Sequence, residues 1–130
     1  MKHENLEIRL MTMLLAGDDI TLKQLREQYA HASVVSRESS DVGFFTTFSL
    51  QGRDDLRVNN KSFQIGDVDG NLNEIYGAVG FILYIKNGFI STLEGYTNAI
   101  DKWPEDDEEI ILKYDSGNER DIKRLISKWE

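Results

Sequence analysis

Two apolar runs in the middle of the chain flank the dipeptide Asn87-Gly88. Residues 80–86 and 89–96 consist mainly of aliphatic and aromatic side chains. Asn-Gly is the pair best suited to a two-residue turn in which both residues take positive φ. The pattern therefore predicts a long β-hairpin and a fold that contains an antiparallel sheet.

A two-residue loop also sets the register of this hairpin. It places Lys86 opposite Phe89 and, continued outward without interruption, Phe81 opposite Glu94. Side chains alternate between the two faces of a strand. One face is expected to carry Ile82, Tyr84, Phe89 and Leu93, and the other Phe81, Leu83, Ile85, Ile90, Thr92 and Glu94. Because both faces are apolar, we expect a central hairpin covered by helices on one side and by a loop, a second subunit or a partner on the other.

Helical periodicity occurs at both ends of the chain. Residues 4–15 carry one apolar stripe, and Gly17 is a plausible stop for this first helix. Thr21-Leu22-Lys23-Gln24 has the form of a capping box and predicts the start of a second helix. Ser116-Gly117-Asn118-Glu119 has the same form and predicts a C-terminal helix.

Between these helices the apolar pattern changes to a period of two. Besides the hairpin, strands are expected at residues 31–36, 44–50, 63–70 and 110–114. The polar residues 51–61 are expected to form a mobile loop. Two helices, six strands and one helix follow each other without strand-helix alternation. This order predicts a single α+β domain over residues 1–130, with an antiparallel sheet of about five to six strands and helices on one side.

Charge narrows the class of partner. The chain of 130 residues has 23 acidic and 15 basic side chains, a net charge of −8. Phosphate backbones repel such a surface, so we expect no nucleic-acid binding. A basic protein partner is compatible with this charge, as is a role in solubility alone.

The composition also points to a compartment. No cysteine is present, which excludes disulfides and thiolate metal sites and fits a reducing environment. No apolar run reaches membrane-spanning length, and acidic residues stand where a signal peptide has basic ones. We therefore expect a cytoplasmic protein that does not bind membranes.

Few residues offer catalytic or metal-binding chemistry. The histidines are His3 and His31, and His31 is expected to close the end of the second helix. A serine-histidine-carboxylate triad stays open because it is defined in space, although no Gly-x-Ser-x-Gly motif occurs. Residues 67–71 resemble the start of a calcium loop, but Leu72 and Ala78 stand where that loop requires glycine and glutamate. We expect no cofactor and no metal.

Two carboxylates are the best candidates for a site. By the register above, Glu94 lies on an apolar face beside Phe81, where an acid must be paired or have a raised pKa. Asp67 falls on the same face of its strand as Phe63 and Ile65. If the strands bring the two carboxylates together, they can act as an acid-base pair. Alternatively, each accepts backbone amides of a nearby turn or leaves the sheet where the core ends.

The segment 105–109 is the densest charge on the chain, with five consecutive acidic residues. Like charges in a row keep a segment extended and solvated. It can dock a basic partner with Trp103 as an aromatic anchor, or it is a solvated loop with Trp103 packed into the core.

Several short segments resemble a group of small bacterial proteins that share GFFT, GDV and LEG(Y/F)T segments. In this chain they are Val42-Gly43-Phe44-Phe45-Thr46, Ile65-Gly66-Asp67-Val68, Gly80-Phe81-Ile82-Leu83 and Leu93-Glu94-Gly95-Tyr96-Thr97, with Trp103-Pro104 behind them. That group has no assigned activity. The resemblance, which spans residues 12 to 104, implies a bacterial, cytoplasmic protein and carries over no catalytic residue.

These observations favour a non-enzymatic domain that binds a protein, such as a basic one in the manner of small acidic immunity proteins, or that associates with itself. The candidate binding residues are Glu94, Asp67, Phe81 and Trp103, and no catalytic residue is expected. The alternative is an enzyme or small-ligand-binding protein with Asp67 and Glu94 in one pocket.

Overall fold

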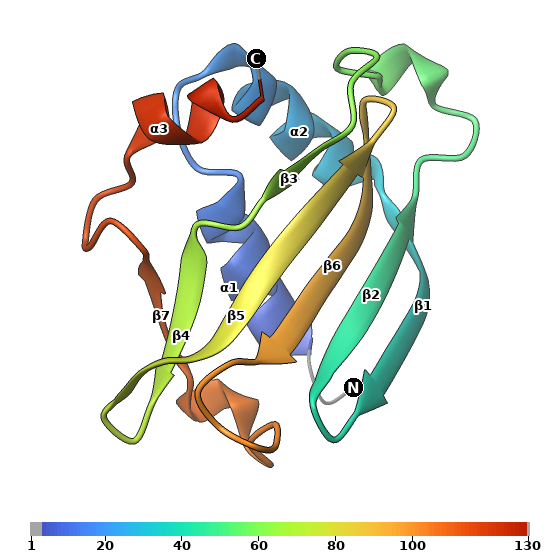
Figure 1. Cartoon of the computed structure of the whole chain (residues 1–130). Coiled ribbons are helices and arrows are strands. Elements are labelled where there is room, and N and C mark those ends of the chain that lie inside the picture. The colour runs from blue at the N-terminus through green and yellow to red at the C-terminus, as the bar shows by residue number, and fades with distance from the viewer. Residues whose placement is uncertain (1–3, 130) are drawn as a thin grey trace.

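The structure of the chain, a computed structural model, describes residues 4–129. This part contains three α-helices and seven strands, which confirms the predicted α+β class with one strand more than the expected maximum (Figure 1). The helices are α1 (Glu4–Leu14), α2 (Ile20–His31) and α3 (Ile122–Ser127). The strands are β1 (Ser33–Ser40), β2 (Gly43–Ser49), β3 (Phe63–Ile65), β4 (Val68–Leu72), β5 (Ile75–Lys86), β6 (Phe89–Thr97) and β7 (Ile111–Tyr114). His3 lies outside the described residues.

All strands of the described chain belong to one antiparallel sheet. Its order is β1-β2-β6-β5-β4-β7, and β3 pairs with the end of β5 that β4 does not reach. The hairpin around Asn87-Gly88 is formed by β5 and β6, which are interior strands. The predicted central position of this hairpin is therefore confirmed.

The helices cover only one face of the sheet. In the view of Figure 1, α1 and α2 lie behind the sheet, and no helix of residues 4–129 crosses the face toward the viewer. The core between the layers includes Leu6, Leu10, Leu14, Leu22 and Leu25 from the helices and Phe81, Leu83, Ile85, Ile90 and Leu93 from the hairpin. The predicted helix layer is present. A loop, a second subunit or a partner as the cover of the second face stays a prediction.

A β-bulge in β6 changes the predicted register of the hairpin. Lys86 pairs with Phe89 and Ile85 with Ile90 as expected, but Tyr84 then pairs with Thr92, so Ser91 is the extra residue of the bulge. From there on, the predicted pairs are wrong by one residue. The bulge turns Leu93 into the core and turns Glu94 out of it. An uninterrupted register would have buried a carboxylate and exposed a leucine, which is the more costly arrangement.

Gln28 of α2 fixes the end of the hairpin beside this bulge. Its side chain is fully buried and accepts a hydrogen bond from the Ile90 N–H at 2.9 Å. Its amide group donates to the carbonyls of Gly88 at 2.7 Å and Leu56 at 2.8 Å. The hairpin turn and the polar segment 51–61 are thereby attached to the helix layer.

The expected strand at residues 63–70 is two strands. β3 ends at Ile65 and β4 begins at Val68, because the two strands pair with different ends of β5. A tight turn at Asn73 and Glu74, with φ of 49° and 65°, then starts β5 well before the predicted hairpin. Glutamate is rare at positive φ, so the residue pattern did not mark this turn.

Several predicted boundaries are also corrected. α2 begins after Asp19, whose carboxylate accepts from the N–H groups of Thr21 and Leu22, so the N-cap lies two residues before the predicted box. α3 begins at Ile122 after the N-cap Asp121. Ser116 instead donates to the Glu119 carbonyl within a turn. β1 runs from residue 33 to 40 rather than from 31 to 36, and His31 ends α2 as expected.

The acidic segment 105–109 is partly packed, contrary to the prediction. Residues 107–109 form a 3₁₀ turn, and Asp107 is only 2% exposed. Arg9 of α1 donates to the carbonyls of Ile110 and Asp107, which attaches the turn to the helix layer. The other four residues of the segment are exposed. Among residues 4–129, no helix is long and apolar enough to cross a bilayer.

Candidate functional site

The open face of the sheet carries side chains in cross-strand rows. The central row is Glu38–Phe45–Glu94–Ile82, in which each residue lies directly opposite the next on β1, β2, β6 and β5. The row above it, toward the Asn87-Gly88 turn, is Ser36–Thr47–Thr92–Tyr84–Gln64. We call these two rows the open face. It combines aromatic rings, hydroxyl groups and two carboxylates.

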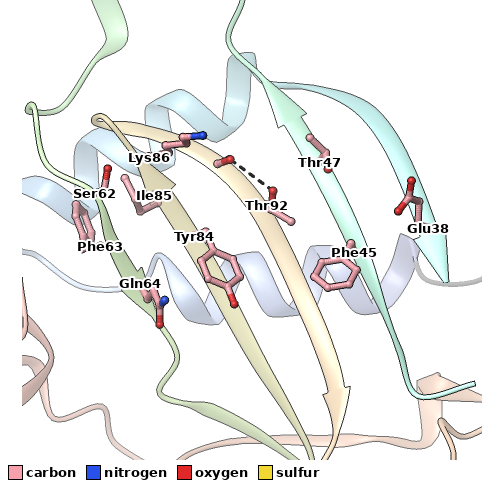
Figure 2. Close-up of a pocket in the computed structure, with 11 residues that line it drawn as sticks. Glu38, Phe45, Thr47, Ser62, Phe63, Gln64, Tyr84, Ile85, Lys86 and Thr92 are labelled. Carbon is pink, nitrogen blue, oxygen red and sulfur yellow. Dashed lines mark hydrogen bonds between the residues drawn. The ribbon is translucent and has the colours of Figure 1, made fainter. Parts of the chain in front are cut away.

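The two aromatic rings project from the sheet on either side of β6. Figure 2 shows the rings of Phe45 and Tyr84 rising from β2 and β5 with Thr92 between them. Phe45 is 45% exposed, although its chain neighbour Phe44 is buried in the core. The rings border a shallow groove of about 670 Å³, lined by Glu38, Phe45, Thr47, Ser62, Phe63, Gln64, Tyr84, Ile85, Lys86, Ser91 and Thr92.

Tyr84 and Glu94 form a hydrogen-bonded pair at the edge of this groove. The tyrosine hydroxyl donates to Oε1 of the carboxylate at 2.7 Å. This bond, with burial second, raises the pKa of Tyr84 to about 12. The hydroxyl therefore stays protonated near neutral pH and acts as a fixed donor. It holds one carboxylate oxygen, and within residues 4–129 the other oxygen, Oε2, has no hydrogen bond.

Asp67 lies in a different environment from Glu94. Its carboxylate receives two hydrogen bonds from the Arg120 guanidinium, both 2.8 Å long, and both side chains are almost fully buried. The cavity that Asp67 helps to line also contains Ile82 and Tyr96, but not Glu94. The two carboxylates thus have separate partners, Arg120 and Tyr84, although Ile82, which lies opposite Glu94, also lines the cavity of Asp67.

The remaining two candidates are core residues. Phe81 is 1% exposed and Trp103 is 8% exposed. Trp103 meets the rings of Phe44 and Phe81 edge-on, with centroid distances of 5.4 and 6.1 Å. Its backbone N–H donates to the Asp41 carbonyl at 2.6 Å. In this structure neither side chain is presented to a partner, and Trp103 packs against Phe44 and Phe81 in the core.

Phe45, Tyr84 and Glu38 are not among the site residues that the sequence pattern predicts. The alternation in β2 predicts that Phe44 and Phe45 point to opposite faces of the sheet. It does not predict which of the two rings points toward the helices. Tyr84 lies on the strand that the sequence predicts. The predicted register, however, places Glu94 on the other face of the sheet from Tyr84. The available signal was Glu94, a charged residue two positions after Thr92 on an interior strand. Because the bulge at Ser91 cannot be recognised from the sequence, the face of the sheet on which Glu94 lies could not be predicted.

No metal centre is found in the part of the chain that the structure describes. No group of three or more potential ligand side chains gathers there. Residues 68–72 of the calcium-like segment form β4 and pair with β5 and β7 instead of forming a loop. His31 is exposed, and its Nδ1 lies 3.4 Å from Nη1 of Arg53.

Comparison with protein-family models, with curated proteins and with solved structures finds no match for this chain in any of the three. The geometry and charge of the open face therefore carry the proposed function.

Proposed function

We propose that the chain is a non-enzymatic protein-binding domain, which receives a basic partner protein on its open face. The observation that supports this most directly is the central row, in which Phe45 is 45% exposed between two carboxylates. Partly exposed aromatic side chains beside hydrogen-bonding groups are typical of the residues that contribute most to protein interfaces.

The shape of the open face favours a macromolecule over a small ligand. Small-molecule sites are enclosed and bury most of their ligand. The groove between Glu38 and Gln64 is shallow and crosses the sheet from β1 to β3. Its hydroxyl and amide groups can bind to an irregular protein surface directly or through water.

Charge favours a basic partner. The chain carries a net charge of −8, and Glu38 and Glu94 add carboxylates to the open face itself. Complementary charge raises the rate of association and the specificity of such a complex. This combination resembles the way small acidic immunity proteins bind basic targets. The absence of cysteine and the resemblance to small bacterial proteins extend the proposal to a bacterial, cytoplasmic setting.

A second copy of the chain fits the open face less well. A symmetric dimer buries the same patch of both subunits against itself. Each copy would bring a net charge of −8 and the carboxylates of its open face to such an interface, and like charges across an interface are costly. We therefore propose a different protein as the partner.

The enzymatic alternative has little support. It requires Asp67 and Glu94 to act on one substrate, but each carboxylate already accepts hydrogen bonds from a different side chain, Asp67 from Arg120 and Glu94 from Tyr84. A carboxylate clamped by a buried arginine is typical of a structural ion pair.

The test is capture from a lysate of the source organism at low salt, followed by mass spectrometry. We expect the wild type to retain a basic protein and Phe45→Lys to lose it. This substitution removes the aromatic ring and places a positive charge between the two carboxylates, which repels a basic partner. Ile20→Lys makes the same charge change at a 64% exposed position of α2, on the helix layer, and should retain the partner. Absence of any partner, or equal retention by Phe45→Lys, would contradict the proposal.

A further inference from the structure

The central row brackets one aromatic ring with two carboxylates. Glu38 and Glu94 lie directly opposite Phe45 on its two neighbouring strands. Neighbouring strands are about 4.8 Å apart, so the two acidic residues stand on strands about 10 Å apart with the ring between them. Within residues 4–129, no ion pair includes either carboxylate.

Two basic side chains lie near this row, but neither pairs with its carboxylates. Arg37 precedes Glu38 in the chain, but its Nε donates to Glu7 of α1 at 2.7 Å, on the helix side. Lys86 lines the groove beside Ser62, near the hairpin turn (Figure 2). The ring and its two carboxylates therefore offer an anionic aromatic site without a cation of this chain.

We propose that Glu38, Phe45 and Glu94 form the binding site for an arginine side chain of the basic partner, a proposal that rests on the function proposed above. A guanidinium group is planar and stacks on the face of an aromatic ring. Its five N–H donors point outward in the plane, so it can donate to a carboxylate on each side of the ring. An ammonium group of lysine is a compact charge and meets only part of this arrangement.

Tyr84 is a positioning residue for this site. Its hydroxyl donates to Oε1 of Glu94 at 2.7 Å and leaves Oε2 for the incoming guanidinium. The pair holds the carboxylate in one orientation before the partner arrives, which lowers the entropy lost on binding. The half-buried position of Glu94 between Phe45 and Ile82 also reduces its exposure to competing water.

The experiment is an NMR titration of the isotope-labelled chain with the peptide acetyl-Gly-Arg-Gly-amide at low salt. We expect saturable shifts of the backbone amides of Phe45, Glu94 and Tyr84 at millimolar peptide. The citrulline peptide, which has the same shape without the charge, should give none. The lysine peptide should bind more weakly.

Matched variants identify the groups involved. Glu94→Gln should weaken binding of the arginine peptide about tenfold or more, since it removes a charged acceptor. Phe45→Leu should weaken it by about two- to fivefold through loss of the stacked ring. Glu109→Gln removes the same charge from the exposed acidic segment and should leave binding unchanged. The NMR spectrum of each variant shows directly whether the variant is folded. If Glu94→Gln does not fold, Glu38→Gln on the edge strand replaces it in the titration.

Three results would overturn the inference: no saturable shift, equal shifts with the citrulline peptide, or shifts centred on residues 105–109. These results are separate from those of the capture experiment. If Phe45→Lys abolishes capture of the partner but no arginine peptide binds, the open face remains the interface and the arginine site is wrong. If the peptide binds at the row but no partner is captured, the proposed function fails instead.

Discussion

The contact between the Tyr84 hydroxyl and the Glu94 carboxylate joins two neighbouring strands of the sheet on its open face. The bond is 2.7 Å long, and each side chain comes from a different strand of the central hairpin. The sequence pattern marks Glu94 as an acid within an apolar segment, and this part of the prediction indicated the right region of the sheet. It could not identify the partner, because one extra residue in β6 exchanges the faces of every side chain that follows.

The Tyr84 hydroxyl should lose its proton at a higher pH than an ordinary tyrosine does. Its pKa is raised from 10.0 to about 12 by the hydrogen bond to Glu94 and by burial. Because the neutral hydroxyl is favoured in the folded state, its contribution to stability is complete below pH 10 and is lost as the pH rises toward 12. In Glu94→Gln, the pKa of Tyr84 should fall toward 10.0.

The measurement is the pH dependence of the tyrosine ring signals by NMR. Tyr114 is the internal control, since its pKa is raised first by burial and does not depend on Glu94. A pKa of Tyr84 that is the same in both proteins would show that the hydrogen bond does not form in solution.

At the scale of elements, the central hairpin depends on glycine where the layers approach closely. Gly95 lies opposite Phe44 on one side and Phe81 on the other. On the core side of the sheet, a Cβ at this position would lie within 2.9 Å of the Trp103 ring and closer still to Phe44. The LEGYT segment therefore contains glycine for packing, while the neighbouring Glu94 turns to the open face.

Gly95→Ala should destabilise the fold by about 1–3 kcal/mol, because the added methyl group overpacks two aromatic rings. Gly66→Ala is the matched control, since its Cβ would meet only the Phe81 carbonyl at 3.5 Å and the Ile82 side chain at 3.6 Å, which are ordinary contacts. Urea unfolding followed by tryptophan fluorescence measures both. Equal stability of the two variants would show that the region around Trp103 is loosely packed.

At the scale of the whole molecule, Arg120 connects parts that are distant in the sequence. Its guanidinium binds Asp67 through two N–H groups and donates to the Ala16 carbonyl, just beyond α1, at 2.8 Å. The same group lies 5.2 Å from the centroid of the Tyr114 ring. The sheet, the end of α1 and the segment before α3 meet at this side chain.

Arg120→Met should lower the free energy of unfolding by about 3–5 kcal/mol, since it leaves the Asp67 carboxylate buried without its cation. Arg53→Met breaks an exposed pair with Asp55, which solvent screens, and should leave the free energy of unfolding nearly unchanged. In the double variant Asp67→Asn with Arg120→Met, part of the loss should be recovered. Equal effects of the two arginine substitutions in urea unfolding would contradict a structural role for the buried pair.

The sequence by itself determined the α+β class, the three helices and the central hairpin, because these follow from local patterns such as helical periodicity, strand alternation and the Asn-Gly turn. Only the tertiary structure decided which faces these elements present. The bulge at Ser91, the packing of Trp103 and the clamp on Asp67 each depend on contacts between residues far apart in the chain. Because of these contacts, Glu94 lies on the open face beside Phe45, and Phe81 and Trp103 lie in the core.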